Sequence, residues 1–319
     1  MVNKVLITGG LGFLGGRIAK YFSDKGYAVI LATRKPENKF PKNIPANTLV
    51  MQLDYSSDEQ LNEAMKGIDT LIHLAGPNIH SSSYDPKNII RYHIKLTERL
   101  LRVAKSNNLN KFIYLSTIHV YGKNLKDLVT EETKPNPVHP FAEAHLAAEK
   151  ILTAQADNIL VKIIRCSNSF GIPYFENEKC WKLVVNDFCR SAFKAGKFTI
   201  NSSGQDYRDF ISVGDVVQAI HYLLELNNEK GIHDIYNLGS SRSTSIIEIA
   251  KKIQKVLKDG FDYDCPIIKN KPSKKMNKPK HFILSTEKIK RLGLKSELGD
   301  DELFSLLNHC KIKYQLINQ

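Results

Sequence analysis

Short apolar segments alternate with helix-length segments through the first half of this 319-residue chain, and this alternation restricts the fold more than any other feature. We predict strands at Val5–Ile7, Ala28–Thr33, Thr48–Leu53, Thr70–Leu74, Lys111–Leu115 and Leu160–Arg165. The segments between them predict helices at Gly12–Lys25, Asp58–Lys66, Lys87–Ser106 and Pro140–Gln155. Helical crossovers of this kind connect parallel strands, so the expected fold is α/β, with a Rossmann-type doubly wound parallel sheet.

The second half of the chain loses this regular alternation. Helical patterns remain at Val184–Ala195 and Ile246–Leu257, while Pro173–Lys182 is polar and loop-like. The chain length favours two domains. We place the boundary near residue 166, giving a domain of residues 1–165 and a smaller C-terminal α/β domain of residues 166–319, from which some segments return to the first.

Composition narrows the class of protein. The 46 Lys and Arg against 33 Asp and Glu give a formal net charge of +13, which suits a polyanionic partner or serves solubility alone. No apolar run approaches the roughly 20 residues that cross a membrane, and the five cysteines show neither a CxxC pair nor metal-like spacing. We expect a cytoplasmic protein with no membrane segment and no metal site.

A glycine-rich turn follows the first strand, reading TGGLGFLG from Thr8 to Gly15. Such a turn needs Gly where φ is positive, a second Gly where backbone N–H groups approach a pyrophosphate, and a third where helix and strand pack closely. The next helix then directs its N-terminus at the phosphates. This context predicts dinucleotide binding by Gly9, Gly12, Phe13, Leu14 and Gly15. A nucleic-acid partner would leave the turn unexplained, so none is expected.

The end of the second strand bears on the choice between NAD and NADP. An acid usually follows this strand and binds the adenosine ribose, but the chain reads Ala32-Thr33-Arg34-Lys35. Arg34 suits a 2′-phosphate, although it can also stack on adenine or remain solvated. Asp54, after the third strand, is a candidate acceptor for the adenine edge. The cofactor is therefore predicted as NAD or NADP, tightly bound.

Several further motifs recur in order: DTLIHLAG at Asp69–Gly76, LSTIHVYG at Leu115–Gly122, RCSNSFGIP at Arg165–Pro173, and YNLG at Tyr236–Gly239. With them the chain resembles the extended short-chain dehydrogenase/reductase family, in particular its nucleotide-sugar epimerases, dehydratases and reductases. The resemblance implies that the first domain binds NAD(P), with Leu74, Ala75 and Gly76 at the cofactor. It also implies that the second domain binds a nucleoside-diphosphate sugar.

The chain departs from this family at its catalytic positions. The family uses an Asn, a Ser or Thr, and a Tyr-x-x-x-Lys; here His93 falls where Asn is frequent, Phe141 at the Tyr and His145 at the Lys, and only Thr117 keeps its residue type. In the family's 4,6-dehydratases an Asp and a Glu follow that Thr and carry out the elimination. Here they are Ile118 and His119, which disfavours a dehydratase.

These departures change which group can accept a proton. Phe141 has no ionisable proton, whereas imidazole has a pKa of about 6.5, near working pH. His145 and His119 are the competing candidates for the base, with a slight preference for His145, and the pH–rate profile is expected to show a pKa near 6–7. His145 would also contact the nicotinamide ribose, as the family's Lys does.

On the substrate side the resemblance implies that Asn168 and Arg208 hold the diphosphate or nucleotide. Lys278, in a basic loop, is a further candidate for the diphosphate, and His80, Tyr84 and Thr117 are candidates for contacting the sugar. The predicted function is NAD(P)-dependent hydride transfer at sugar C4, by a dehydrogenase, reductase or epimerase that supplies bacterial surface polysaccharide precursors. The alternative is a catalytically inactive protein that binds cofactor and nucleotide sugar.

A homo-oligomer, dimer or tetramer, is also predicted. Family members pair through two long helices, which here are Lys87–Ser106 and Pro140–Gln155. An exposed apolar seam on these helices would be formed by Ile90, Ile94, Leu101, Leu146 and Ile151. The alternative is that these residues only pack on the sheet.

Overall fold

The computed structural model describes residues 3–76, 85–123, 125–155, 157–176, 178–226, 233–270, 281–294 and 299–315. These residues form two compact units. The first unit comprises Met1–Lys123, Glu131–Cys166 and Val217–Asn237, and the second comprises Asn124–Thr130, Ser167–Val216 and Leu238–Gln319. The chain therefore passes from one unit to the other more than once.

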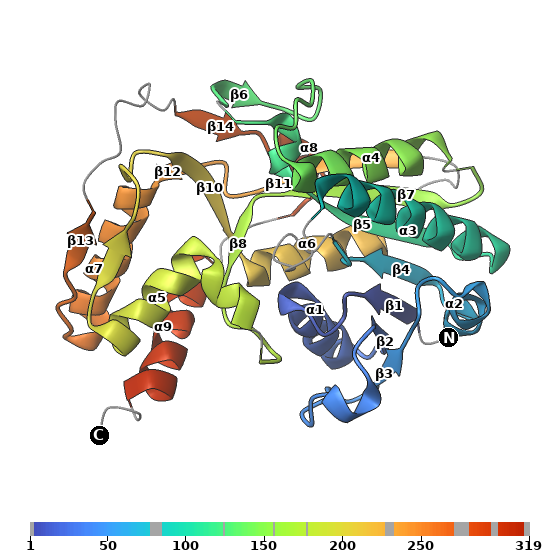
Figure 1. Ribbon diagram of the computed structural model, residues 1–319, viewed down its shortest axis with the longest axis horizontal. Coiled ribbons are helices and arrows are strands. Elements are labelled where there is room, and N and C mark those ends of the chain that lie inside the picture. The colour runs from blue at the N-terminus through green and yellow to red at the C-terminus, as the bar shows by residue number, and fades with distance from the viewer. Residues whose placement is uncertain are drawn as a thin grey trace. The chain divides into compact units, whose positions relative to one another are not determined.

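The first unit is built on a seven-stranded sheet in the order β11-β7-β5-β4-β1-β2-β3 (Figure 1). Its strands are β1 (Lys4–Thr8), β2 (Ala28–Thr33), β3 (Thr48–Gln52), β4 (Thr70–His73), β5 (Lys111–Thr117), β7 (Leu160–Cys166) and β11 (His233–Leu238). The neighbouring pairs β7–β5, β5–β4, β4–β1, β1–β2 and β2–β3 are all parallel. The α/β fold with a doubly wound sheet is thus confirmed, and β11 is a seventh strand that the sequence analysis did not predict.

Helices cover this sheet because their apolar stripes match its apolar faces. The helices are α1 (Phe13–Asp24), α2 (Asp58–Met65), α3 (Pro86–Ser106), α4 (Pro140–Ala154) and α6 (Val213–Glu225). Side chains of α2, α3 and α4 share one core with Leu71 of β4, Phe112 and Tyr114 of β5, and Val161 of β7. Rings on α1 and α6 contact one another separately, through Phe22 and His221.

The start of α4 has a clear local cause. Pro140 occupies the first turn, where its missing N–H costs nothing. The ring Nδ1 of His139 accepts a hydrogen bond from the Phe141 backbone N–H at 3.3 Å. This cap fixes where the helix begins, and therefore the direction in which Phe141 and His145 project.

The second unit contains three small sheets. They are β8 (Asn168–Phe170), β10 (Tyr207–Ser212) and β12 (Ser243–Ser245); β9 (Phe198–Ile200) with β13 (Ile267–Lys269); and β6 (Asp127–Val129) with β14 (Phe282–Leu284). Its helices are α5 (Val184–Ala195), α7 (Ile246–Phe261), α8 (Glu287–Arg291) and α9 (Gly299–Gln315). A capping box between Ser245 and Glu248 starts α7.

One residue of the predicted apolar seam is placed wrongly by the sequence analysis. Leu101 is only 1% exposed and belongs to the core beneath α3. Ile90, Ile94, Leu146 and Ile151 are half-buried, and Ile151 packs against the same core. The reason is that α3 contacts α4 within the same unit, so both helices bury apolar side chains against each other and against the sheet.

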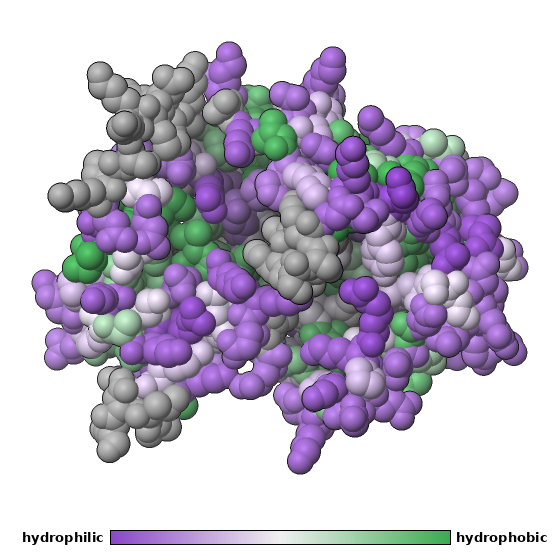
Figure 2. All heavy atoms as spheres, viewed as in Figure 1, coloured by the Kyte–Doolittle hydropathy of each residue, from purple (hydrophilic) through white to green (hydrophobic). Residues whose placement is uncertain are grey.

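On the face drawn in Figure 2, hydrophilic residues predominate and hydrophobic ones occur in small groups. Within the described residues, no helix is both long enough and apolar enough to cross a membrane. The same residues contain no group of three or more His, Cys, Asp or Glu side chains arranged to hold a metal ion.

Candidate functional site

The glycine-rich turn has the geometry of a phosphate-binding turn. Gly9 has φ +71°, and a Cβ there would lie 3.1 Å from the Ala75 backbone nitrogen. Gly12 caps α1 without a side chain and donates its N–H to the Gly9 carbonyl at 2.8 Å. A Cβ on Gly15 would lie 2.5 Å from the Gly10 oxygen. The first turn of α1, where Phe13 and Leu14 stand half-buried, leaves backbone N–H groups available for an anion.

The segment after β4 lies directly against this turn. Leu74 donates its backbone N–H to the Thr8 carbonyl at 3.2 Å, and the Ala75 N–H lies 3.4 Å from the Thr8 hydroxyl. The turn and Leu74–Gly76 therefore form one surface. The residues present fit a dinucleotide, because Gly9, Gly12 and Gly15 carry no side chain where its pyrophosphate would approach.

Arg34 and Asp54 extend from the two strand ends beside the turn. Arg34 is exposed, and its guanidinium carbon lies 5.8 Å from the ring centre of Tyr92 on α3. Asp54 accepts hydrogen bonds from the backbone N–H of Ser56 at 2.8 Å and from its hydroxyl at 2.7 Å. These bonds lower the pKa of Asp54 below its ordinary value, so an acceptor carboxylate is present at this edge.

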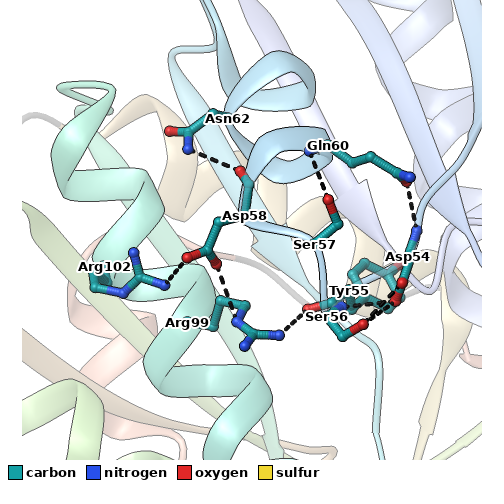
Figure 3. Close-up of polar contacts among 9 residues, drawn as sticks. All are labelled: Asp54, Tyr55, Ser56, Ser57, Asp58, Gln60, Asn62, Arg99 and Arg102. Atoms are coloured by element: carbon teal, nitrogen blue, oxygen red, sulfur yellow. Dashed lines mark hydrogen bonds and ion pairs between the residues drawn. The ribbon is translucent and has the colours of Figure 1, made fainter.

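Figure 3 shows how the loop that carries Asp54 is held in place. Asp58 at the start of α2 pairs with Arg99 at 3.1 Å and with Arg102 at 2.7 Å, both on α3. Arg99 also donates to the Tyr55 carbonyl at 3.1 Å, and the Tyr55 hydroxyl donates to the Ala32 carbonyl at 3.1 Å. The loop is thus tied both to α3 and to the end of β2.

A buried hydrogen-bonded network, formed by His93, Tyr114 and His145, lies behind the same surface. The Tyr114 hydroxyl is 2.6 Å from His145 Nδ1 and 2.9 Å from His93 Nε2. His145 Nε2 lies 3.6 Å from where a Cβ on Gly76 would be. His145 therefore joins this network through one ring nitrogen and faces the predicted cofactor surface with the other.

Burial makes every member of this network neutral near pH 7. Desolvation holds the pKa of His145 well below the ordinary value for histidine, and the neighbouring His93 and His73 lower it further. Desolvation also lowers the pKa of His93 to about 4 and raises that of Tyr114 well above its usual range. This direction argues against a pKa of 6–7 in the pH–rate profile if His145 is the base, because that value belongs to a solvated imidazole.

Thr117, His119 and Phe141 lie next to this network. Thr117 ends β5, is 8% exposed, and accepts a hydrogen bond from the His119 backbone N–H at 3.2 Å. The His119 side chain is exposed, with its ring centre 6.5 Å from that of Phe141. The Phe141 ring meets His145 edge-on, with centres 4.5 Å apart. The structure thus brings together the catalytic positions that the sequence predicted.

A buried ion pair fixes α4 against the sheet. Glu149 of α4 accepts from Arg165 of β7 at 2.7 Å and from the Ser116 hydroxyl of β5 at 2.5 Å. Arg165 also donates to the Tyr121 hydroxyl at 2.9 Å. Because Glu149 lies one turn after His145, this pair sets the position of the His145 backbone relative to β5.

Of the predicted substrate residues that the structure describes, Thr117 lies in the first unit, and Asn168 and Arg208 lie in the second. Asn168 donates its side-chain amide to the Asp209 carbonyl at 2.9 Å, and Arg208 is half-buried on β10 opposite Thr244. The buried Asp209 carboxylate accepts from Ser240 and Arg242 backbone N–H groups at 2.9 and 3.1 Å. The predicted residues His80, Tyr84 and Lys278 lie outside the described part of the chain.

The sequence analysis missed Tyr114 and His73. His73 is fully buried, and its Nδ1 lies 2.7 Å from the Thr8 hydroxyl, at the start of the glycine-rich turn. A signal for both was available, since each is a polar residue near the carboxyl end of an apolar strand. Ligands of open α/β sheets bind at that edge.

Comparison with known proteins settles the family. Residues 5–239 match the model of the NAD dependent epimerase/dehydratase family. The chain belongs to this family. The family's NAD dependence agrees with the predicted NAD(P) cofactor, and the resemblance to nucleotide-sugar epimerases and dehydratases is confirmed.

The individual relatives include proteins named as dehydratases and proteins named as epimerases. The chain is 27% identical over 280 residues to a dTDP-D-glucose 4,6-dehydratase of Dictyostelium discoideum, covering 79% of this chain. It spans 62% of that relative and 44% of the length of three longer Arabidopsis thaliana relatives. Dehydratases therefore stand among the relatives, and they give no support to the expectation that elimination is excluded.

Solved structures show the same fold. UDP-glucose 4-epimerase from Thermotoga maritima, determined with UDP-glucose, superposes with a TM-score of 0.79 at 24% identity, covering 98% of this chain and 99% of that one. MoeE5, determined with UDP-glucuronic acid and NAD, gives 0.79 at 20% identity, with 98% and 99% coverage. Both comparisons confirm the doubly wound architecture.

Proposed function

We propose that this protein transfers a hydride at C4 of a nucleoside-diphosphate sugar, as a dehydrogenase, a 4-keto reductase or an epimerase. The observation that carries the proposal is the placement of His145, whose Nε2 faces Gly76 beside the glycine-rich turn. A neutral imidazole at this position can accept or return a hydroxyl proton. NAD(P), when bound, accepts or donates the hydride.

The roles of the neighbouring groups follow from their chemistry. In the oxidative direction, a base must take the hydroxyl proton as the hydride leaves the carbon. Thr117 orients the hydroxyl by hydrogen bonding, and His145 accepts its proton. His119 is the competing base because its ring is exposed and its centre lies 6.5 Å from that of Phe141. Phe141 itself provides only an apolar wall.

We propose hydride transfer without elimination of water. Elimination needs an acid and a base beside Thr117, and the chain has Ile118 and His119 there. Ile118 is buried and cannot exchange protons. The proposed setting is cytoplasmic synthesis of bacterial surface polysaccharide precursors by a homo-oligomer, a dimer or tetramer, which rests on the resemblance to nucleotide-sugar enzymes.

The second candidate function is a catalytically inactive protein that binds cofactor and nucleotide sugar. Phe141 favours it, because the family's usual hydroxyl base is missing there. A panel of GDP-, UDP-, CDP- and dTDP-linked sugars, followed at the absorbance of reduced nicotinamide and by mass spectrometry of products, separates the two. Oxidation, reduction or a stereochemically changed sugar is expected. Loss of one water from a product would show a dehydratase, and binding without conversion would show the inactive protein.

His145→Ala and His119→Ala then identify the base. Each variant is compared with wild type for cofactor binding and for turnover at saturating substrate. His145→Ala should bind cofactor and lose about 10²–10⁴-fold in turnover, the usual contribution of general acid–base catalysis. Wild-type turnover in both variants would contradict a histidine base.

A further inference from the structure

The Tyr114 hydroxyl lies between two histidines and can donate only one hydrogen. It contacts His145 Nδ1 at 2.6 Å and His93 Nε2 at 2.9 Å, and Tyr114 is 1% exposed. One imidazole nitrogen must therefore donate to the hydroxyl while the other accepts from it. The hydrogen bonds can run in either of two directions, and the network is neutral in both.

The two directions differ at the ends of the network. In the first, His145 Nδ1–H donates to Tyr114, Tyr114 donates to His93 Nε2, and His145 Nε2 is bare. In the second, all bonds are reversed, and His145 Nε2 carries the hydrogen. The first state presents a base toward Gly76 and the second presents an acid.

The network ends at the second ring nitrogen of His93, Nδ1. Within the described part of the chain, His93 Nδ1 is buried and has no hydrogen-bond partner. A buried polar nitrogen without a partner costs free energy unless it serves a further purpose or meets a water. His73, whose ring centre is 5.9 Å from that of His93, is bound instead to Thr8 and stands outside the network.

We propose that His145, Tyr114 and His93 form a proton relay that carries the hydroxyl proton from the sugar side of His145 to His93 Nδ1. The proposal rests on the proposed function and deepens it. Tyr114 and His93 are positioning residues that act through His145. The relay allows His145 to serve as base and as acid without staying charged in a buried site.

The proton count balances at every atom. His145 Nε2 takes up the hydroxyl proton and forms a new N–H bond. Its Nδ1–H proton moves to the Tyr114 oxygen, and the former Tyr114 proton moves to His93 Nε2. His93 then passes its Nδ1 proton to a water molecule that enters beside this buried nitrogen. One proton enters at His145 and one leaves at His93, and all three residues begin and end neutral. Reduction of a keto sugar uses the same path in reverse.

A spectroscopic test needs no turnover. Nitrogen-15 resonances of labelled histidines report which ring nitrogen carries the hydrogen. We expect Tyr114→Phe to shift the ring signals of both His93 and His145, because both lose one shared partner. Tyr27→Phe is the matched control, since the Tyr27 hydroxyl lies 3.2 Å from His221 Nε2 and that variant should shift His221 alone. Unchanged His93 and His145 signals in Tyr114→Phe would overturn the network.

A kinetic test then examines proton movement. With a nucleotide sugar that wild type converts, single-turnover hydride transfer should fall about tenfold or more in Tyr114→Phe and in His93→Gln, within the range of acid–base contributions. The double variant should lose no more than the more affected single variant, because both changes break one path. Cofactor affinity should be unchanged in each, and Tyr27→Phe should keep the wild-type rate.

The outcomes separate the relay from the proposed function. An active wild type with an equally fast Tyr114→Phe variant contradicts the relay and leaves hydride transfer standing. A wild type that binds cofactor but converts no nucleotide sugar contradicts the proposed function, and the relay falls with it. If His93→Gln does not fold, the rate of hydride transfer in Tyr114→Phe and the nitrogen-15 signals of the histidines still test the relay.

Discussion

Acidification from pH 7 to pH 5 should destabilise this protein through its buried histidines. His73, His93 and His145 are at most 6% exposed, and burial lowers the pKa of each, that of His93 to about 4. In the unfolded chain they titrate near 6.5. Between these values the unfolded chain binds more protons than the folded one, so stability is present above pH 6.5 and is lost as the pH falls.

The magnitude follows from this difference. At pH 5 the unfolded pKa of about 6.5 lies about 1.5 units above the pH. At about 1.36 kcal/mol per unit, a histidine that stays neutral when folded therefore lowers the free energy of unfolding by about 2 kcal/mol. With a folded pKa of about 4, His93 contributes nearly all of that. The pKa values of His73 and His145 are lowered in the same direction, so the loss of stability in the whole protein should exceed the part due to His93.

Urea unfolding at pH 7 and pH 5 measures this loss. His93→Gln removes one titrating group, so its stability should fall by about 2 kcal/mol less than that of wild type between the two pH values. The control is His233→Gln, which makes the same substitution at an exposed position of the same unit and shows whether the effect depends on burial. An identical pH dependence in wild type and His93→Gln would refute the assignment of a neutral buried His93.

Three further predictions concern activity and cofactor. Because burial lowers the pKa of His145, the acid limb of the pH–rate profile should lie below the ordinary range of histidine, and His145→Ala should abolish that limb; a limb that persists in His145→Ala would assign the base to another group. Arg34→Ala should weaken NADP binding about tenfold and leave NAD binding unchanged by titration calorimetry, since only NADP carries the 2′-phosphate; unchanged affinity for both would assign Arg34 to Tyr92 alone. Phe141→Tyr should raise turnover if the site lacks only its usual base, and unchanged turnover would show that the network has replaced it.

Local pattern was sufficient for most of the first unit. The six predicted strands all occur, because each is an apolar run whose neighbours in sequence are its crossover helices. The glycine-rich turn was also predictable, since Gly9 and Gly15 act within a few residues of their own positions. β11 was missed because His233–Leu238 joins the sheet from beyond the predicted boundary, through a pairing that no local pattern records.

The same limit explains the errors at the site. Sequence placed His93 and His145 at family positions but did not show that they meet through Tyr114, which lies 21 and 31 residues away from them. The pKa of 6–7 was expected for a solvated imidazole, whereas burial lowers the pKa of His145. Leu101 was misassigned because an amphipathic helix between a sheet and another helix has more than one apolar stripe.

The altered residues are consistent with one another as a set. A lysine at position 145 would bring a fixed charge into a site whose immediate neighbours are Phe141, Tyr114 and His93, none of them anionic at neutral pH. An isolated buried charge is costly, whereas a neutral imidazole is not. The phenol missing at position 141 is matched by Tyr114 on the sheet side of His145. Proton exchange at His145 would thus run to Tyr114 on the sheet and not to a phenol at position 141, which requires the Lys, Tyr and Asn positions to change together.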